Sequence, residues 1–492
     1  MQIQQFRNTV YQSFRQRADA SMDLVDALTV AGHVDSPVAL SEETPFRRKF
    51  SAIFDTLLHG EIDFNLLVQA LFEYQPSDSE QIAGYEVYGL DCTPNEREEA
   101  ETLEDRGSLK AQKDEPARYG HKYSWLVRLI NWRTSWAAPV DVRRVETSVT
   151  DSQVASIQVK ELAQHNPKPK VIVADSLYGN HLFLAIFLAA KNVFALVRLR
   201  SNQVFYGPPK PHPKGTKGAS AKHGAKFKLS DPSRPPDRTE TFLLGEQTVL
   251  LKAWQGLHLK KLHKLVGMVL QIEFLRPDGT PRYKRPMWLF WSGPEIVSLS
   301  ELCRMYLWRF AIEHLFRFLK QHMGLNANQS TDLVSTQQWM WLCALAYWQL
   351  LLMRDEIPNA RPAWYPAKSV QGAKKMTPGL VQRGALRFLV QLGTPAQATR
   401  TAGKGKGRSK GYHPAPRQRF PVVKRPKWHR ISLQKRPERC FWFTALFFMV
   451  QALFGAIFAF LKSRRTDPIR FLQVQRSRTT GLMINGHTIR LI

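Results

Sequence analysis

The strongest periodic pattern in the chain runs from Ser298 to Gly324. Its sequence, SLSELCRMYLWRFAIEHLFRFLKQHMG, spaces apolar residues as one face of a helix does, and Ser298 with Glu301 forms a capping box at its start. We therefore predict one long helix that ends near Gly324. At about 100° per residue, a polar face carries Tyr306, Arg309, Glu313, Arg317 and Lys320, and a roughly opposite apolar face carries Trp308, Ile312, Leu315, Phe316 and Leu319. The apolar face should pack on a core, and the polar face should meet a partner.

Residues 79–200 alternate between strand-like and helix-like runs. Three runs predict strands: YEVYGLD, which ends at Asp91, then HKYSWLVRLINW and SWAAPVDVRRV. A helix over SVTDSQVASIQVKELAQH follows, then a buried strand, VIVA, that ends at Asp175, a helix over HLFLAIFLAAKN and a strand over VFALVRLR. This order, followed later by the long helix, is that of an α/β fold of the RNase H-like type. It places an acid at the end of its first and fourth strands.

The other regions flank or interrupt this core. Residues 1–78 show helical periodicity, which suits either a small DNA-binding module or a helical cap on the next domain. We divide the chain into 1–78 (helical), 79–200 (first part of the catalytic core), 201–295 (mostly β insertion), 296–325 (final helix of the core), 326–397 (helical), 398–430 (basic tail) and 431–492 (extension). The Gly- and Pro-rich basic tail should be disordered alone and able to lie along phosphates.

The extension contains an apolar run, residues 440–461, that is long enough to span a bilayer. Three interpretations remain open: a membrane anchor, a helix packed on the body of the protein, or an extension without a selected role. The irregular sequence that follows the run favours the third. We therefore do not expect the protein to associate with a membrane through residues 440–461.

Composition narrows the class of partner. The chain has 492 residues, a formal net charge of +29 and a pI near 10.1. A protein this basic usually meets a polyanion, and nucleic acid is the first candidate, ahead of a membrane surface or a ribosome. The four cysteines are far apart and show no zinc spacing, which fits a reducing, cytoplasmic setting at the nucleoid. No small-molecule substrate is expected.

Three acids suggest the chemistry. Asp91 and Asp175 each follow a predicted strand, and adjacent ends of parallel strands would bring their carboxylates within a few ångströms, where they repel one another. Hard divalent cations, Mg²⁺ or Mn²⁺, relieve that repulsion, and two such ions can activate water and stabilise the leaving oxygen of a phosphodiester. Glu313 would complete the site. A single Asp at a strand end is more often a turn or cap residue, so the prediction depends on all three acids.

The spacing Y-(2)-R-(3)-E-(6)-K from Tyr306 to Lys320 resembles the YREK motif of cut-and-paste insertion-sequence transposases of the DDE class. Asp91 in YGLDCTP, Asp175 in IVADSLYG and Glu313 in YLWRFAIEHLFRFLK match the catalytic triad of that prokaryotic family. The resemblance implies a β insertion between the second and third acids.

The resemblance also implies contacts with DNA. Tyr306, Arg309 and Lys320 would contact the transposon end, and Arg317 shares their face. Related transposases stack a flipped base on an aromatic residue of the insertion. The candidates here are Trp254, Trp288 and Trp291, with Trp254 as our choice and a place in the sheet core as the commoner alternative. His121, Thr93 and Arg97 could also reach the site, although a structural role is the stronger expectation for His121.

The expected function is that of a DNA transposase. It would bind the terminal inverted repeats of its element as a homodimer, nick each end with metal-activated water and join the 3′-hydroxyls to target DNA. Two alternatives share the fold: a structure-selective, metal-dependent nuclease and an inactive DNA-binding relic. A membrane-anchored protein is a more distant alternative.

Overall fold

The computed structural model describes residues 1–109, 116–210, 219–231, 234–358, 376–399 and 407–424, with the backbone of two short strands, β15 (Leu482–Ile484) and β16 (His487–Ile489). The chain forms two compact units, Met1–Arg425 and Pro426–Ile492, and the second is described only by the antiparallel β15–β16 pair. The apolar run 440–461 lies outside the described residues. None of the helices within those residues is long and apolar enough to cross a membrane.

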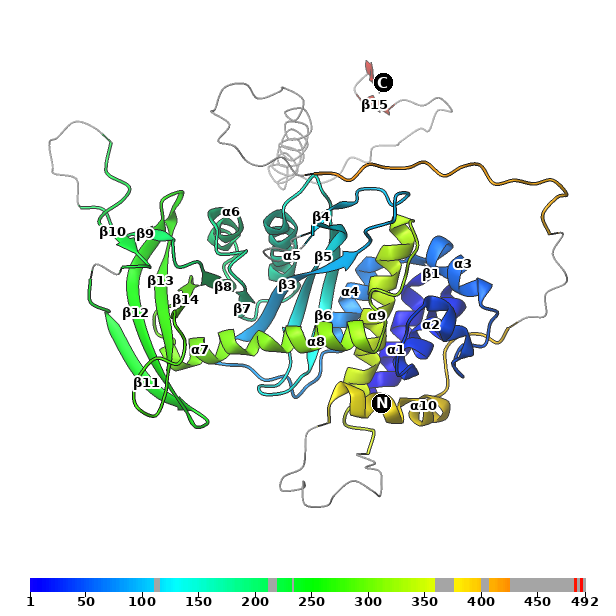
Figure 1. The fold of residues 1–492 in the computed structure, drawn as a ribbon, viewed down its shortest axis with the longest axis horizontal. Coiled ribbons are helices and arrows are strands. Elements are labelled where there is room, and N and C mark those ends of the chain that lie inside the picture. The colour runs from blue at the N-terminus through cyan, green and yellow to red at the C-terminus, as the bar shows by residue number, and fades with distance from the viewer. Residues whose placement is uncertain are drawn as a thin grey trace, which may run out of the picture. The chain divides into compact units, whose positions relative to one another are not determined.

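A large mixed sheet forms the centre of the first unit (Figure 1). Its central strands are β3 (Glu86–Glu96), β4 (Gly107–Leu109), β5 (Arg118–Leu129), β6 (Ala137–Val145), β7 (Lys170–Ala174) and β8 (Val193–Leu199). Strands β3, β7 and β8 are parallel to one another, whereas β5 pairs antiparallel with β3, β4 and β6. Every residue of β7 is buried, as expected for a strand covered on both faces.

Strand β3 corrects one prediction, because it does not end at Asp91. Its parallel pairing with β7 stops at Leu90, opposite Ala174, but its antiparallel pairing with β5 continues to Glu96. The antiparallel partner supplies hydrogen bonds that the sequence pattern did not reveal. Asp91 therefore lies where one ladder ends and another continues.

The described part of residues 201–295 carries six more strands: β9 (Val204–Tyr206), β10 (Lys226–Lys228), β11 (Arg238–Leu244), β12 (Gln247–Leu259), β13 (Leu262–Leu275) and β14 (Met287–Trp291). They extend the central sheet, because β14 pairs antiparallel with β8. The sheet order in the described chain is β10-β9-β12-β13-β14-β8-β7-β3-β5-β4, with β11 beside β12 and β6 beside β5. The insertion is thus joined to the strands that carry the acids.

Helices cover both faces of the central strands (Figure 1). One face carries α5 (Asp151–His165) and α6 (His181–Leu184) with the 3₁₀ helix η2 (Ala185–Leu188), and the other carries α7 (Leu299–Trp308) and α8 (Phe310–Gln321). The single helix predicted from Ser298 is therefore two helices, which meet at Arg309. The N–H of Arg309 bonds back to Tyr306 rather than one residue further, so the helical ladder is interrupted there. The capping box of Ser298 with Glu301 is present.

A helical body packs beside β6. It combines α1 (Gln2–Ser13), α2 (Ala18–Val30), α3 (Ser51–His59), α4 (Phe64–Glu73), α9 (Leu333–Met353) and α10 (Pro378–Leu392), with the 3₁₀ helix η1 (Pro37–Glu42) and the short β1 (Phe14–Gln16) and β2 (Glu61–Ile62) pair. Helix α9 is buried on nearly all sides. Inside the helical body, the buried Arg7 guanidinium pairs with Asp26. Asp26 also accepts a hydrogen bond of 3.0 Å from Gln349 Nε2. This network joins α1 and α2 to α9, which comes more than 300 positions later in the chain.

Candidate active site

Asp91 and Asp175 are neighbours on adjacent strands. The last parallel pair of β3 and β7 is Leu90 with Ala174, and each acid is the next residue along its strand. Asp91 Oδ1 accepts a bond of 2.8 Å from the N–H of Cys92, and Asp175 Oδ1 accepts one of 2.8 Å from the N–H of Leu177. These backbone bonds orient the two carboxylates at the same edge of the sheet.

Arg309 connects Asp91 to Glu313. Its Nη1 lies 2.8 Å from Asp91 Oδ2 and its Nη2 lies 3.0 Å from Glu313 Oε1. Burial of the guanidinium opposes its charge, but Asp91, Tyr306, Glu313 and Asp175 together raise the pKa of Arg309 above its usual value. The break between α7 and α8 therefore places one cation among three carboxylates.

The electrostatics of Asp91 reflect this crowding. Burial raises the pKa of Asp91 to about 6, the charge of Arg309 acts in the opposite direction, and the charge of Asp175 adds to the increase. One guanidinium does not balance three carboxylates. The site therefore retains an excess of negative charge that a further cation would relieve.

Gly89 explains how α8 reaches the acids. A Cβ atom on Gly89 would lie 2.1 Å from Ile312 Cδ1, far closer than two carbon atoms can approach. The missing side chain lets Ile312 pack directly on β3, next to Glu313. Phe316 adds an edge contact with Trp125, at 5.8 Å between ring centroids. Because the apolar face of α8 packs on β3, the polar face of this helix lies close to Asp91.

The other motif residues differ in their surroundings. Tyr306 is buried beside Arg309, and burial raises its pKa while Arg309 and Arg198 act against the increase. Burial lowers the pKa of Lys320, and nearby Glu96 opposes that change. Arg317 is exposed. Tyr306, Arg309 and Glu313 therefore share the neighbourhood of the acids, whereas Lys320 lies toward the end of β3.

Trp254 belongs to the core of the sheet in this structure. It is 2% exposed, its ring packs against Phe227 and Trp288, and its Nε1 donates to the carbonyl of Arg234 at 3.0 Å. Trp288 and Trp291 are buried as well. A contact between Trp254 and DNA stays a prediction that would require this side chain to become exposed first.

The three less specific candidates have internal partners. Arg97 is buried and donates to the carbonyls of Asn328 and Ser330, each at 2.9 Å. His121 Nε2 lies 2.8 Å from the carbonyl of Glu104, and Thr93 is buried. Arg97 and His121 thus hold loops and strands together, and Thr93 is a buried residue of β3.

The donor set suits a hard divalent cation, although it is not a closed cage. Carboxylate oxygens are the ligands that Mg²⁺ and Mn²⁺ prefer. Within the described residues, no group of three or more His, Cys, Asp or Glu side chains is arranged to hold a metal ion as it stands. At this site Arg309 is bonded to one oxygen of Asp91 and to one oxygen of Glu313.

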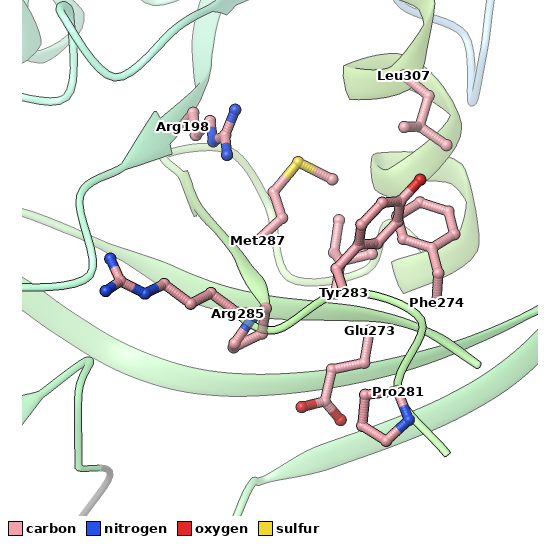
Figure 2. Close-up of a pocket in the computed structure, with 10 residues that line it drawn as sticks. Arg198, Glu273, Phe274, Pro281, Tyr283, Arg285, Met287 and Leu307 are labelled. Carbon is pink, nitrogen blue, oxygen red and sulfur yellow. The ribbon is translucent and has the colours of Figure 1, made fainter. Parts of the chain in front are cut away.

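A cavity of about 370 Å³ opens between the insertion and α7 (Figure 2). Figure 2 shows Tyr283 and Phe274 on one side of it and Arg285 on the other, with Arg198 at the end of β8. Tyr283 is 58% exposed and meets Phe274 edge to face at 5.8 Å. Exposed aromatic faces beside guanidinium groups suit an unstacked base and its phosphate.

Sequence reasoning missed Gly89, Arg198 and Tyr283. A glycine inside a predicted strand is a recognised sign of close backbone approach, so YEVYGLD contained a signal for Gly89. Arg198 and Tyr283 stand in a strand and a turn that have no distinguishing local pattern. Their proximity depends on the pairing of β8 with β14.

The chain was compared with known proteins. The family described as DDE superfamily endonuclease matches residues 9–260, which is just over half of the chain and includes Asp91 and Asp175 but not Glu313. No match is found among curated proteins. Among solved structures, the chain is similar to a piggyBac transposase in a synaptic complex with hairpin DNA, with 11% sequence identity, 82% of this chain and 79% of that chain covered, and a TM-score of 0.39. The family match shows that the chain belongs to the DDE superfamily of endonucleases.

Proposed function

We propose that the chain is the DNA transposase of a prokaryotic insertion sequence, built on an RNase H-like core. It binds the terminal inverted repeats of its element as a homodimer, cleaves the ends and joins the 3′-hydroxyls to target DNA. The observation that carries the proposal is the meeting of three acids from distant segments, with Arg309 bonded to Asp91 and Glu313 and within electrostatic range of Asp175.

Endonucleases of the DDE superfamily use divalent metal ions, and Asp91, Asp175 and Glu313 would hold them here. We propose two Mg²⁺ or Mn²⁺ ions, which when bound supply an activated water and stabilise the leaving oxygen. In the metal-free protein one oxygen of Glu313 is bonded to Arg309, so a metal ion would compete with that guanidinium for it.

The chain's own cations would position the DNA. Arg309 offers two parallel N–H donors to a phosphate, Lys320 offers a point charge, and Arg317 is exposed on the same helix. The buried Tyr306 would fix the orientation of Arg309 from behind. In the cavity beside α7, Tyr283 would stack an unpaired base, a role for which it is better placed than the buried Trp254.

A cleavage assay on the DNA that flanks the gene tests the proposal. The full chain is incubated with that DNA with and without Mg²⁺, beside Asp175→Ala and the control Asp141→Asn, which changes a buried acid on β6 that carries no role in the proposal. We expect metal-dependent cuts at both borders, absent only in Asp175→Ala. Cuts at branched junctions regardless of sequence would indicate the structure-selective nuclease, and binding without cuts would indicate the inactive relic.

A further inference from the structure

The basic segment 407–424 contacts the body of the protein. It carries the cations Arg408, Lys410, Arg417, Arg419 and Lys424 and no acid, and every residue from 407 to 419 is exposed. Its second half is bonded to residues 101–107.

Two backbone hydrogen bonds fasten the segment. The N–H of Phe420 donates to the carbonyl of Glu101 at 2.8 Å, and the N–H of Val423 donates to the carbonyl of Arg106 at 3.0 Å. Val423 also forms a parallel bridge with Gly107, the first residue of β4. The segment therefore continues the edge of the sheet beyond β4 through bonds that do not depend on its side chains.

Side-chain contacts add to this attachment. Arg419 pairs with Glu101 at 3.0 Å, and Arg417 donates to Thr331 Oγ1 at 3.3 Å. The Arg419 and Glu101 side chains are 79% and 57% exposed, so their pairing is weak in water. A phosphate could therefore displace Glu101 from Arg419 at little cost, while the backbone bonds hold the segment in place.

The attachment point is continuous with the catalytic strand. Glu96 ends β3 only five residues after Asp91, about 17 Å along the strand. Arg97 then ties the following loop to the carbonyls of Asn328 and Ser330, just after α8. The segment is thus bonded to the loops that follow β3 and α8, the elements that carry Asp91 and Glu313.

The surface beside the segment is acidic. A hollow of about 710 Å³ is lined by Glu96, Glu98, Glu99 and Glu101 together with Arg419. These glutamates are exposed and would repel a phosphate backbone. A duplex that approaches this edge is therefore favoured on the side where the segment presents its cations.

We propose that residues 407–424 form a docked clamp for duplex DNA, which grips phosphates beside the cleavage site from a position fixed by the Phe420 and Val423 backbone bonds. The inference rests on the proposed function, because it takes DNA as the substrate of the acids. It adds that the segment acts as a fixed part of the DNA-binding surface and not as a loosely tethered charge.

Proline substitution separates attachment from charge. Phe420→Pro with Val423→Pro removes both donating N–H groups but keeps every cation, because proline has no backbone N–H. The matched control, Phe420→Ala with Val423→Ala, removes the same side chains and keeps both N–H groups. A third variant, Arg408→Gln with Lys410→Gln, removes two cations away from the attachment point. Thermal melting of each variant checks that the body remains folded.

The binding of the full-length wild type and the three variants to end DNA is measured between about 50 and 300 mM salt. In this range the loss of phosphate contacts changes the affinity strongly. The proline variant should bind several-fold more weakly with an unchanged salt slope, and the alanine control should match the wild type. The glutamine variant should lose about 1.8 from the slope, at ~0.9 for each phosphate contact. A proline variant that binds like the alanine control would overturn the clamp.

An unrelated duplex of equal length distinguishes the two proposals. The clamp acts on phosphates, so the same ranking of variants should appear on that duplex even if the wild type fails to cut its own ends. Cutting by the wild type with identical binding by all variants would refute the clamp alone. Failure to cut, with the ranking preserved, would refute the transposase proposal alone.

Discussion

Asp91→Asn should make the metal-free protein more stable near neutral pH while it abolishes cleavage. The folded protein holds Asp91 at a pKa of about 6, chiefly through burial. In an unfolded chain an aspartate titrates near ~3.9. At neutral pH the fold must therefore keep a carboxylate ionised where its surroundings favour the protonated form. Asparagine has the shape of that protonated form and carries no charge.

The magnitude follows from the shift. A rise of roughly 2 pH units, at about 1.36 kcal/mol for each, gives an upper bound near 3 kcal/mol. The Asp91 side chain is 23% exposed, so water screens part of this cost and we expect about 1 to 2 kcal/mol. Between about pH 4 and 6 the folded state binds more protons than the unfolded state, so stability falls as pH rises through this window. Above pH 6 the full cost is present, and below pH 4 it vanishes.

Calorimetric melting in EDTA at pH 4 and pH 7.5 measures the effect. We expect Asp91→Asn to melt about 1 to 3 °C above the wild type at pH 7.5 and no higher at pH 4. Mg²⁺ should raise the melting temperature of the wild type and not that of the variant. A variant that is less stable than the wild type at pH 7.5 in EDTA would show that the ion pair with Arg309 outweighs burial, and the reasoning would fail.

Asp141→Asn is the matched control. Burial raises the pKa of Asp141 to about 6 as well, and its nearest cation is Arg143 on the same strand. The control should therefore gain similar stability at pH 7.5. It should also keep both cleavage and the response to Mg²⁺, because Asp141 lies outside the proposed metal site.

Three further predictions concern Gly89, Glu313 and Tyr283, each with a variant that tests its role in the site. Gly89→Ala should reduce cleavage at least tenfold by pushing Ile312 off β3, and adding Ile312→Ala should recover part of the activity in the same assay. Glu313→Gln should abolish cleavage but leave end binding within about twofold of the wild type by mobility shift, because it removes a metal ligand and no cation; an equal loss of binding would make Glu313 structural. Tyr283→Ala should lower the yield of end processing several-fold without unfolding the protein, because Tyr283 is exposed. Trp254→Phe should lower the melting temperature of the protein, because Trp254 is buried.

The strand end at Asp175 could be predicted because its signal is local: a buried apolar run stops there. The end of β3 at Asp91 was predicted wrongly, because the pairing with β5 carries that strand to Glu96. The break at Arg309 could not be predicted in this way. Phe310 and Ala311 favour no interruption, and the guanidinium is held by Asp91, which lies 218 positions away in the chain. That contact exists only once β3 and α8 are packed.

The same dependence on contacts between distant segments explains why the burial of Trp254, and that of the polar residues in the helical body, could not be predicted. Along β12, buried and half-buried residues alternate from Val249 to Ala253, and Trp254 breaks this alternation because it is buried directly after the buried Ala253. In the helical body, Arg7, Asp26 and Gln349 read separately as polar residues on apolar helices. Only their mutual hydrogen bonds make the burial of these polar groups favourable. The bonds with Gln349 join segments more than 300 positions apart in the chain.

Arg309 leads to the last prediction, because in the metal-free protein it is bonded to two of the acids that a divalent cation would bind. Its Nη1 donates to Asp91 Oδ2 and its Nη2 donates to Glu313 Oε1. Cation binding should therefore displace the guanidinium, and the displaced group is then free to bind a phosphate. Arg309→Gln should lower the Mg²⁺ concentration at the midpoint of thermal stabilisation several-fold at pH 8, where the carboxylates are ionised, and should still reduce cleavage. A midpoint at or above that of the wild type would mean that Arg309 helps to assemble the acids and does not compete for them.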